Sequence, residues 1–413
     1  MTSPVHVSGL SELRGLTPLA ETNAHADPQV VYNRLRAEWG EVAPVELEPG
    51  INAWLVMGHE ELLHVLRHER LFSKSSLNWR DYTEGRVKPD SPLGSFMFPR
   101  PNAWQADGDE HRRLRAPLED AVGSLRLRQV NQQVLEVCRT LIAEFAPAGQ
   151  ADLLSQYALM IPAVVIGRLL GLDLEAAREM HQVLIDLFAL NENTRAANDR
   201  FEEIFLNLVR ARMAEPTGDM ASIIVHHQKL KDLPEAIHAM VLLIAASNEC
   251  TMAWIGGALQ LMLTDSRFAG RMRGGRLGID DALDEVLWRD PPIANLPARY
   301  TLRDTELGGH RIEQGDPLIL CYAAANADPR VHGDDQWNEI GNRAHLAWSA
   351  GPHVCPAQVP ARLIVRTAVE TVLHELPGVR LTVPAEKLGR LESPWSRCPA
   401  TLPVEFTPTA RAT

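Results

Sequence analysis

One apolar segment limits how this chain can fold more than any other feature. Residues 240–263 read MVLLIAASNECTMAWIGGALQLML and are long enough to cross a bilayer. A polar cluster at residues 247–251 lies at the centre, where an ionised Glu249 would cost at least ~2.5 kcal/mol in lipid. We therefore expect a helix buried inside a globular protein. It should begin near residues 232–234, with Pro234 in the first turn, and its length of roughly 45 Å would cross a whole domain.

The composition narrows the class of protein. Of 413 residues, 45% are hydrophobic and 23% charged, as in ordinary globular proteins, and the formal net charge of −12 argues against nucleic acid as the main partner. The first residues lack the basic and apolar regions of a secretory signal, so we expect a cytoplasmic protein with no membrane partner. Five scattered cysteines do not form a disulfide framework and indicate a reducing compartment. They are Cys138, Cys250, Cys321, Cys355 and Cys398.

Hydrophobic periodicity predicts a mainly α, α+β protein. Residues 42–57 alternate around a Pro-Gly turn and predict a hairpin, while residues 298–322 are rich in strand formers. The periodicity predicts helices at 59–68, 110–122, 127–145, 152–170, 174–190, 198–213, 234–263, 280–289 and about 360–376, and short strands at 378–383 and 402–407. Because no linker or repeat divides the chain, we expect a single domain over residues 1–413.

The most informative segment, residues 348–358, reads WSAGPHVCPAQ. Gly351 permits a tight turn, while the prolines on either side of Cys355 stiffen the loop. Cys355 is predicted to lie at a helix N-terminus, where the helix dipole favours a thiolate. Such a thiolate serves as a nucleophile or as a soft metal ligand. A small buried hydrophobic side chain is the alternative interpretation of Cys355.

This loop resembles that of the cytochrome P450 haem-thiolate monooxygenases, which reads Phe-Gly-x-Gly-x-His-x-Cys-x-Gly. The second glycine, the histidine and the cysteine of that motif match Gly351, His353 and Cys355. Trp348, Ser349 and Ala357 replace the phenylalanine and the other two glycines. The resemblance implies a P450 fold, a helical bundle around haem b with small β-sheets. It implies that Cys355 is the axial iron ligand and that His353 contacts a haem propionate.

Further motifs follow in the order of that family. The segment DEHRRLR at 109–115 resembles its His-x-x-x-Arg helix, which implies that His111 and Arg115 bind propionates. Residues four apart share a helix face, so two cations there suit two carboxylates; a solvated basic face is the alternative. Arg299 matches a third propionate-binding arginine.

Two motifs depart from the family. The long helix carries ASNECT at 246–251 where the family has Ala-Gly-x-Asp/Glu-Thr-Thr, so the resemblance implies that Glu249, Cys250 and Thr251 are catalytic. Cys250 replaces a threonine and is a poor hydrogen-bond donor. We expect less tightly controlled proton delivery, and the alternative is that Cys250 only packs.

The Glu-x-x-Arg motif of the family appears as Glu285-Val286-Leu287-Trp288. In that family the motif arginine belongs to a salt-bridge triad with an arginine that precedes the cysteine loop. We hypothesise that Glu285 still pairs with Arg343 and pairs in addition with Arg289, while Trp288 packs in the place of the motif arginine. The substitution resembles an actinobacterial subgroup whose neighbourhood includes enzymes that oxidatively couple tryptophan-containing cyclodipeptides.

These resemblances imply a haem-thiolate oxidase or monooxygenase that uses O2 to oxidise a small aromatic or amide-bearing natural product, by hydroxylation or coupling. Because the chain has no flavin, nicotinamide or iron–sulfur fingerprint, a ferredoxin and its reductase must supply electrons. We expect their docking patch at Arg112, Arg113, Arg362 and Arg366. The resemblance places substrate-pocket residues at Leu187, Ala245, Ala246, Ile293, Ala294, Leu296 and Ser396.

Other functions fit less well. A haem-binding module without oxygenase activity, acting as a recruitment or regulatory partner, stays an alternative because of the altered motifs. A serine hydrolase would need a helix that starts at Ser349, which Pro352 and Pro356 prevent. His59 and His64 are five residues apart, which is the wrong spacing for a zinc protease.

Overall fold

The computed structural model describes residues 9–188, 194–265, 268, 278–328, 330–331 and 342–409. The chain forms two compact units. Unit 1 comprises Met1–His111, Asp284–Cys355 and Arg390–Arg397, and unit 2 comprises Arg112–Leu283, Pro356–Gly389 and Cys398–Thr413. The prediction of a single domain stays a prediction.

Unit 1 is built on a five-stranded sheet with the strand order β1-β2-β8-β5-β3. Its strands are β1 (Val42–Glu48), β2 (Ile51–Val56), β3 (Phe72–Ser73), β5 (Asn295–Thr301) and β8 (Pro317–Cys321). Only β2 and β8 pair in parallel; β6 (Thr305–Leu307) and β7 (His310–Ile312) form a separate hairpin. The helices are α1 (Leu19–Ala24), α2 (Pro28–Trp39), α3 (His59–Arg67), α4 (Arg80–Thr83), α5 (Gly94–Met97) and α15 (Tyr322–Asn326).

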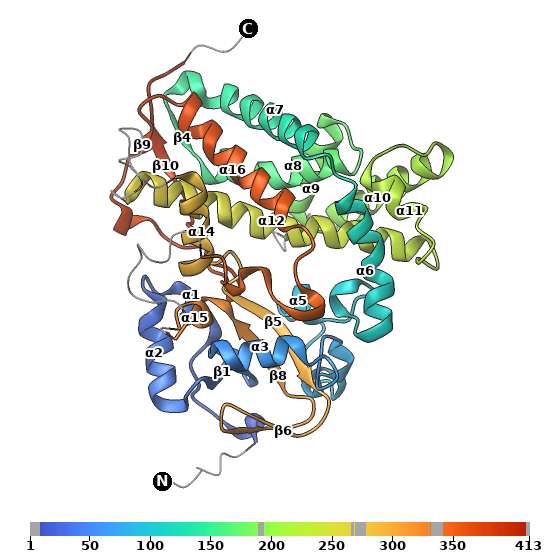
Figure 1. Ribbon diagram of the computed structural model, residues 1–413, viewed down its shortest axis with the longest axis vertical. Coiled ribbons are helices and arrows are strands. Elements are labelled where there is room, and N and C mark those ends of the chain that lie inside the picture. Colours follow the sequence, from blue (N-terminus) through green and yellow to red (C-terminus); the bar gives the residue numbers. More distant parts are fainter. Residues whose placement is uncertain are drawn as a thin grey trace. The chain divides into compact units, whose positions relative to one another are not determined.

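Strand alternation explains how this sheet is covered on both faces. Val56 and its same-face neighbours pack with Leu62 and Leu66 of α3, which lies along the sheet in Figure 1. Leu55, one residue earlier, packs with Tyr32 of α2 on the opposite face. Successive side chains of a strand point to opposite faces, so the fully buried pattern of β2 requires a helix on each side.

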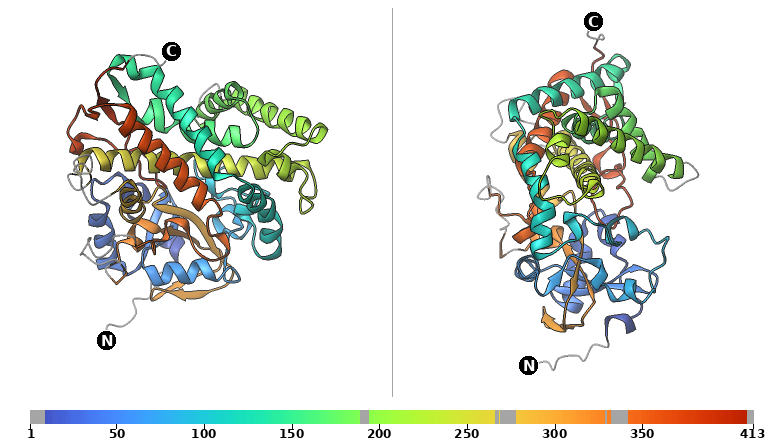
Figure 2. Two further views of the ribbon diagram at one scale, coloured as in Figure 1. Left: turned by 45° about the horizontal axis from the view of Figure 1, so that its top comes forward. Right: turned by 90° about the vertical axis from the view of Figure 1, so that its right-hand side faces the viewer.

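Unit 2 is helical. Its helices are α7 (Leu127–Phe145), α8 (Met160–Leu169), α9 (Leu174–Phe188), α10 (Thr194–Ala214), α11 (Met220–Val225), α12 (Leu233–Thr264) and α16 (Gln358–Glu375). The helices α6 (Gly108–Gly123) and α14 (Ile279–Arg289) run across a boundary between units. A small sheet joins β4 (Gln150–Asp152), β10 (Pro403–Glu405) and β9 (Arg380–Leu381). Helix α16 runs alongside α7, as both views of Figure 2 show.

The apolar segment forms α12, a continuous helix of 32 residues. The side chain of Asp232 caps it by accepting a hydrogen bond from the amide of Glu235 at 3.0 Å, and Pro234 lies in the first turn. Among the described residues, α12 alone is long and apolar enough to span a membrane, which is weak evidence for a span. Within unit 2 it packs against α8 and α16, as expected of a core helix.

The predicted elements are largely confirmed. The hairpin forms β1 and β2, and the helix predicted at 127–145 is α7 with the same limits. The predicted helix at 152–170 begins instead with one π-helical turn, Leu154–Ala158, before α8. The sequence analysis did not predict α2, α11 or α15. The mainly α, α+β class is confirmed.

Candidate active site

The cysteine loop of unit 1 is held closed by its own backbone. Two short 3-10 turns, Leu346–Trp348 and Gly351–His353, precede Cys355, and the amide of Cys355 donates to the carbonyl of Trp348 at 2.9 Å. Gly351 has a φ of +68°, and a Cβ there would lie 2.4 Å from the carbonyl oxygen of Leu66 in α3. Only glycine fits this position, so the matched motif glycine has a physical reason. Helix α16 begins three residues after Cys355.

The five cysteines separate by burial. Cys138, Cys321 and Cys398 are buried, whereas Cys250 and Cys355 are partly exposed. Burial raises the pKa of Cys138 to about 12 and that of Cys321 to about 11. Those two therefore stay protonated thiols at neutral pH, as expected of packing residues.

Arg299 is a buried cation with unused hydrogen-bonding capacity. It projects from β5, is 1% exposed, and its Nε and Nη1 have no hydrogen-bond partner among the described residues. Burial lowers its pKa, while the charges of Asp107 and Glu69 act in the opposite direction. A buried guanidinium with free N–H groups is a strong binder of a carboxylate.

Lys74 lies close to Arg299 and was missed by the sequence analysis. Its Nζ donates to the carbonyl of Pro297 at 2.9 Å and lies 3.6 Å from the centre of the Trp104 ring. Burial is the larger cause, and the charge of Arg299 the smaller one, that lower the pKa of Lys74 well below its usual value. The sequence contained no clear signal, because a single lysine in the run FSKSS is typical of a surface residue.

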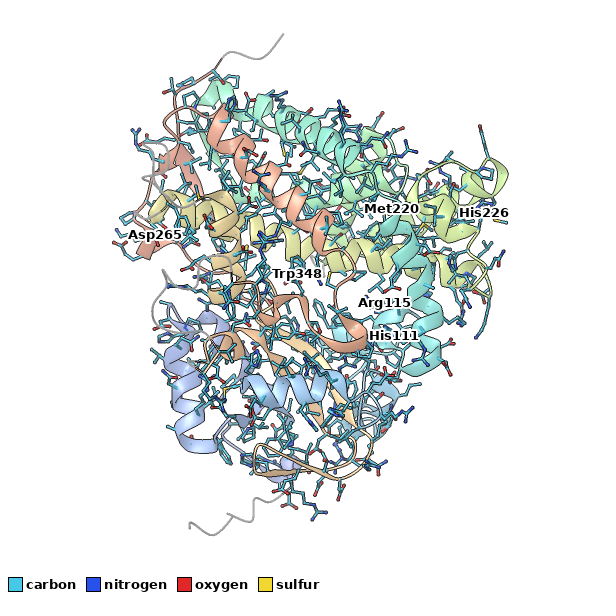
Figure 3. All side chains as sticks on the ribbon, viewed as in Figure 1. His111, Arg115, Met220, His226, Asp265 and Trp348 are labelled. Carbon is cyan, nitrogen blue, oxygen red and sulfur yellow. The ribbon has the colours of Figure 1, made fainter. Side chains whose placement is uncertain are left out.

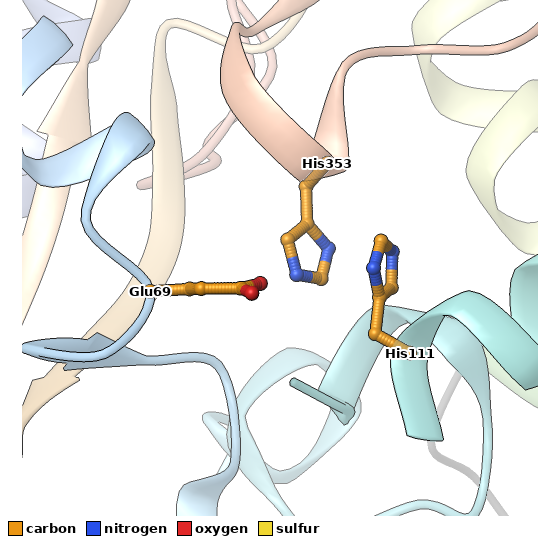
Figure 4. A group of neighbouring side chains, drawn as sticks. All are labelled: Glu69, His111 and His353. Carbon is orange, nitrogen blue, oxygen red and sulfur yellow. The ribbon is translucent and has the colours of Figure 1, made fainter. Parts of the chain in front are cut away.

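Two predicted propionate ligands meet in unit 1. The rings of His111 and His353 stack with centroids 3.9 Å apart, and the Glu69 carboxylate lies beside them (Figure 4). These are also metal-ligating residue types, and their ligand atoms lie within 4.8 Å of one another. However, the rings are inclined by only 27°, so their in-plane lone pairs run side by side and do not converge on one ion.

The donor set of unit 1 fits a cofactor that carries two carboxylates and takes a thiolate ligand. Arg299 and Lys74 are buried cations, and His111 and His353 add two imidazoles. Burial of two cations near one another is unfavourable unless an anion compensates them. Cys355 supplies the sulfur from the same unit. Haem, with two propionates, has the required charge and ligand chemistry.

The centre of α12 in unit 2 carries the predicted catalytic residues. Ala245 and Ala246 are exposed, Glu249 and Cys250 are partly buried, and Thr251 is buried. Small exposed residues in the middle of a core helix leave room for a ligand. The helix stays α-helical through this stretch, and the Ser247 hydroxyl donates to the carbonyl of Ile244 at 3.0 Å.

Three of the four arginines of the predicted docking patch form ion pairs within unit 2. Arg113 binds both carboxylate oxygens of Glu235, with N–O distances of 2.7 and 2.8 Å. Arg362 lies 3.7 Å from Asp280 and over the Trp254 ring. Arg366 lies 3.4 Å from the same Asp280 and is half exposed, and Arg112 is exposed, so the docking patch stays a prediction. Arg115, which shares α6 with His111 (Figure 3), pairs with Glu119 at 2.6 Å.

The altered Glu-x-x-Arg segment is partly as predicted. Arg289 Nε lies 2.7 Å from the Glu285 carboxylate, so the predicted ion pair between these two residues forms. Arg343 pairs instead with Asp284 at 3.2 Å, which corrects the expectation that Glu285 keeps it. Trp288 is buried, and its indole Nε1 donates to the carbonyl of Asn342 at 2.9 Å.

Comparison with known proteins decides the family. No protein-family model matches the chain. It is 26% identical over 401 residues to 2-hydroxy-5-methyl-1-naphthoate 7-hydroxylase of Streptomyces carzinostaticus, covering 94% of this chain and 97% of that protein. It is 27% identical to the cytochrome P450 monooxygenase PikC of Streptomyces venezuelae, covering 92% and 91%. The solved structure of CxnD, a cytochrome P450 for C–S bond formation in chuangxinmycin biosynthesis, matches with a TM-score of 0.81 and 25% identity, covering 96% and 100%.

The chain resembles bacterial cytochrome P450s, in sequence and in fold, over more than 90% of its length. Its fold is the P450 fold, and its enzyme class is that of the P450 monooxygenases. The P450 motif residues Gly351, His353 and Cys355 lie in one loop of unit 1. The same unit also contains Arg299 and His111. Glu249, Cys250 and Thr251 lie in unit 2.

The pocket residues predicted for this P450 fall into three groups. Ile293 and Ser396 pair in an antiparallel bridge, Ala294 directly precedes β5 and Leu296 lies in it, all in unit 1. Ala245 and Ala246 belong to α12. Leu187 belongs to α9, and its side chain lies outside the described residues.

Proposed function

We propose that this P450 binds haem b through Cys355 and oxidises a small natural product with O2 and electrons from a ferredoxin. The observation that carries the proposal is the buried Arg299, whose Nε and Nη1 have no hydrogen-bond partner among the described residues, in the unit that also holds the buried Lys74 and the closed Cys355 loop. A carboxylate-bearing, thiolate-ligated cofactor explains both features together.

The chain holds the cofactor in two ways. Arg299, Lys74, His111 and His353 of unit 1 would neutralise the propionates, and the P450 motif implies Arg115, on the same helix as His111, as a further cation. Cys355 would supply the thiolate ligand, and its backbone amide, bonded to the carbonyl of Trp348, would hold it in place. When bound, haem with a thiolate ligand supplies oxygen activation, because the thiolate donates electron density that favours O–O cleavage.

Residues of α12 deliver protons. Glu249 is a partly buried acid that can hold a proton, and Thr251 offers a hydroxyl about 200° round the helix from it. Cys250 between them is a weak donor and acceptor. Water or a substrate group therefore completes the proton path in place of the family's first threonine.

The substrate is a compact aromatic or amide-bearing compound of secondary metabolism. The names of the relatives support this class: one hydroxylates a naphthoate, and one serves C–S bond formation. Both hydroxylation and oxidative coupling are therefore reactions that proteins of this fold catalyse. A tryptophan-containing cyclodipeptide is the first candidate substrate, because Trp288 and Trp348 resemble the actinobacterial subgroup whose neighbourhood includes enzymes that couple such cyclodipeptides.

Electrons come from a cytoplasmic ferredoxin and its NADPH-dependent reductase. Arg112 is exposed and Arg366 is half exposed, both in unit 2. In a chain with a net charge of −12, such local positive charge steers an acidic partner.

A ligand screen followed by turnover tests this function. Haem-loaded protein is titrated with cyclodipeptides, aromatic acids and macrolides, and displacement of the haem spectrum selects ligands. Each ligand is then incubated with ferredoxin, reductase and NADPH, and we expect an oxidised product. A ligand that binds with no product from any redox pair would instead favour the non-catalytic haem-binding module.

A further inference from the structure

Residues 390–397 form a separate segment of unit 1 that carries Ser396, one of the predicted pocket residues. The structure describes this segment throughout, and none of its residues belongs to a strand. Ser396 forms one isolated bridge, with Ile293 directly before β5. A segment without a ladder of backbone hydrogen bonds needs other partners for its polar groups. Its position therefore depends on the side chains that bind its carbonyls.

Asn295 fastens this segment to β5. Its backbone amide donates to the carbonyl of Trp395 at 3.0 Å, and its side-chain Nδ2 donates to the carbonyl of Pro394 at 2.9 Å. The same Nδ2 also donates to the Thr22 hydroxyl of α1 at 2.9 Å. Asn295 is fully buried and is the first residue of β5. One side chain thus joins the segment, the start of β5 and helix α1.

Helix α1 holds the segment at two further points. Asn23 donates from Nδ2 to the carbonyl of Ser393 at 3.1 Å. The guanidinium of Arg397, which is 2% exposed, donates to the carbonyls of Asn23 and His25 at 3.0 and 3.2 Å. An arginine suits the last carbonyls of a helix. Asp290 accepts from Arg397 Nε at 2.6 Å and compensates the buried charge.

Both asparagines leave one amide oxygen unused. The Oδ1 atoms of Asn23 and Asn295 are inaccessible to solvent and have no hydrogen-bond partner among the described residues. A buried, unpaired amide oxygen costs free energy that an apolar side chain would not. Stability alone therefore does not account for these two side chains. Their N–H groups, by contrast, fix where residues 393–396 lie.

We propose that Asn23 and Asn295 are positioning residues that, with the anchor at Arg397, hold residues 393–396 against the start of β5. They thereby fix one wall of the substrate pocket. The inference rests on the proposed function, because Ser396 belongs to a substrate pocket only in that function. A wall held at several points keeps its contacts with a compact ligand, whereas a loosened wall loses them. None of the three residues that hold the segment is assigned contact with substrate.

Hydrogen exchange of the full-length protein tests whether the segment is held. Asn295→Leu removes the side-chain donors and keeps the branched shape. We expect the amides of residues 390–397 to exchange about ten-fold faster in this variant, because local opening becomes easier. Asn52→Leu is the matched control: Asn52 is buried in unit 1 and donates from Nδ2 to the carbonyls of Leu10 and Leu13. It should leave the exchange of residues 390–397 unchanged.

Two azoles test the pocket wall in the haem-loaded protein by their spectral titrations. Imidazole is small and binds at the iron alone, whereas the phenyl group of 4-phenylimidazole extends into the pocket. In Asn295→Leu and Asn23→Leu we expect the Kd of 4-phenylimidazole to rise about five-fold, a loss of a few wall contacts, and that of imidazole to stay unchanged. A general structural defect would raise both Kd values alike, and Asn52→Leu should raise neither.

Three results would overturn the proposal. They are unchanged exchange of residues 390–397 in Asn295→Leu, an unchanged or lower Kd of 4-phenylimidazole, and an equal rise of Kd for both azoles. Should Asn295→Leu fail to fold, Asn23→Leu decides by the same measurements. The CO spectrum of reduced wild-type protein is recorded first. Absence of thiolate ligation there would overturn the proposed function, whereas the three results above overturn the positioning role alone.

Discussion

The indole of Trp288 donates a 2.9 Å hydrogen bond from Nε1 to the backbone carbonyl of Asn342. Trp288 also meets the His345 ring edge-on at 5.6 Å. It ties α14 to the segment that leads into the cysteine loop, where the family motif uses an arginine. A neutral hydrogen bond in a buried position is less sensitive to salt than an exposed ion pair.

Trp288→Phe should lower the free energy of unfolding by about 1 kcal/mol, because it removes this partly buried hydrogen bond. Urea denaturation measures the change. Arg289→Ala is the control, since its exposed pair with Glu285 is worth at most ~0.5 kcal/mol. A larger cost for Arg289→Ala than for Trp288→Phe would show that Arg289, and not the tryptophan, replaces the motif arginine.

Arg299→Met and Lys74→Met should each speed haem loss by about ten-fold or more, since a charge-assisted hydrogen bond contributes roughly 1.5–3 kcal/mol. The rate of haem transfer to apomyoglobin measures this. The same variants should stabilise the haem-free protein, because a buried charge is removed. Arg311→Met, at a 75% exposed side chain, is the control. Unchanged haem retention in both variants would remove these residues from the cofactor site.

The pair of Arg113 with Glu235 predicts a specific acid sensitivity. Hydrogen bonding from Arg113 lowers the pKa of Glu235 from 4.5 to about 2. Because the folded pKa lies below the unfolded one, the stabilisation is complete above pH 4.5 and is lost as the pH falls toward 2. Glu235→Gln should therefore lower the free energy of unfolding by up to about 3 kcal/mol at pH 7 and leave it unchanged near pH 2. Urea unfolding across pH checks this, with the exposed Glu203→Gln as control; a pH-independent difference would contradict it.

Cys250→Thr should improve coupling several-fold, because a threonine restores a hydroxyl donor and acceptor beside Glu249. The ratio of product formed to NADPH consumed, with peroxide as the by-product, measures coupling once a ligand is found. Cys250→Ala is the control for packing. Equal coupling in wild type and Cys250→Thr would show that Cys250 only packs.

Arg112→Glu and Arg366→Glu should slow electron transfer from ferredoxin by about ten-fold at low salt, with the effect fading as salt screens the charges. Stopped-flow reduction measures the rate. Arg311→Glu of unit 1 should leave it unchanged. A salt-independent loss in the first two variants would indicate misfolding and remove the docking assignment.

The predictable features of this chain are those set by local pattern. Alternation defined β1 and β2, the 3.6-residue period defined α7, and Asp232 with Pro234 marked the start of α12. Gly351 could be recognised because its neighbours force a glycine. Lys74 could not, because its importance comes from its burial near Arg299, which only the folded chain creates. The ion pairs of Arg113 and Arg362 were equally unpredictable, because their partners Glu235 and Asp280 are distant in sequence.

The central claim, that Cys355 is the thiolate ligand of a bound haem, is tested most directly by the CO spectrum of the reduced, haem-loaded protein. We predict the red-shifted band of thiolate ligation in wild type and its loss in Cys355→Ala. A wild-type spectrum of the histidine-ligated type, or an unchanged red-shifted band in Cys355→Ala, would contradict the claim.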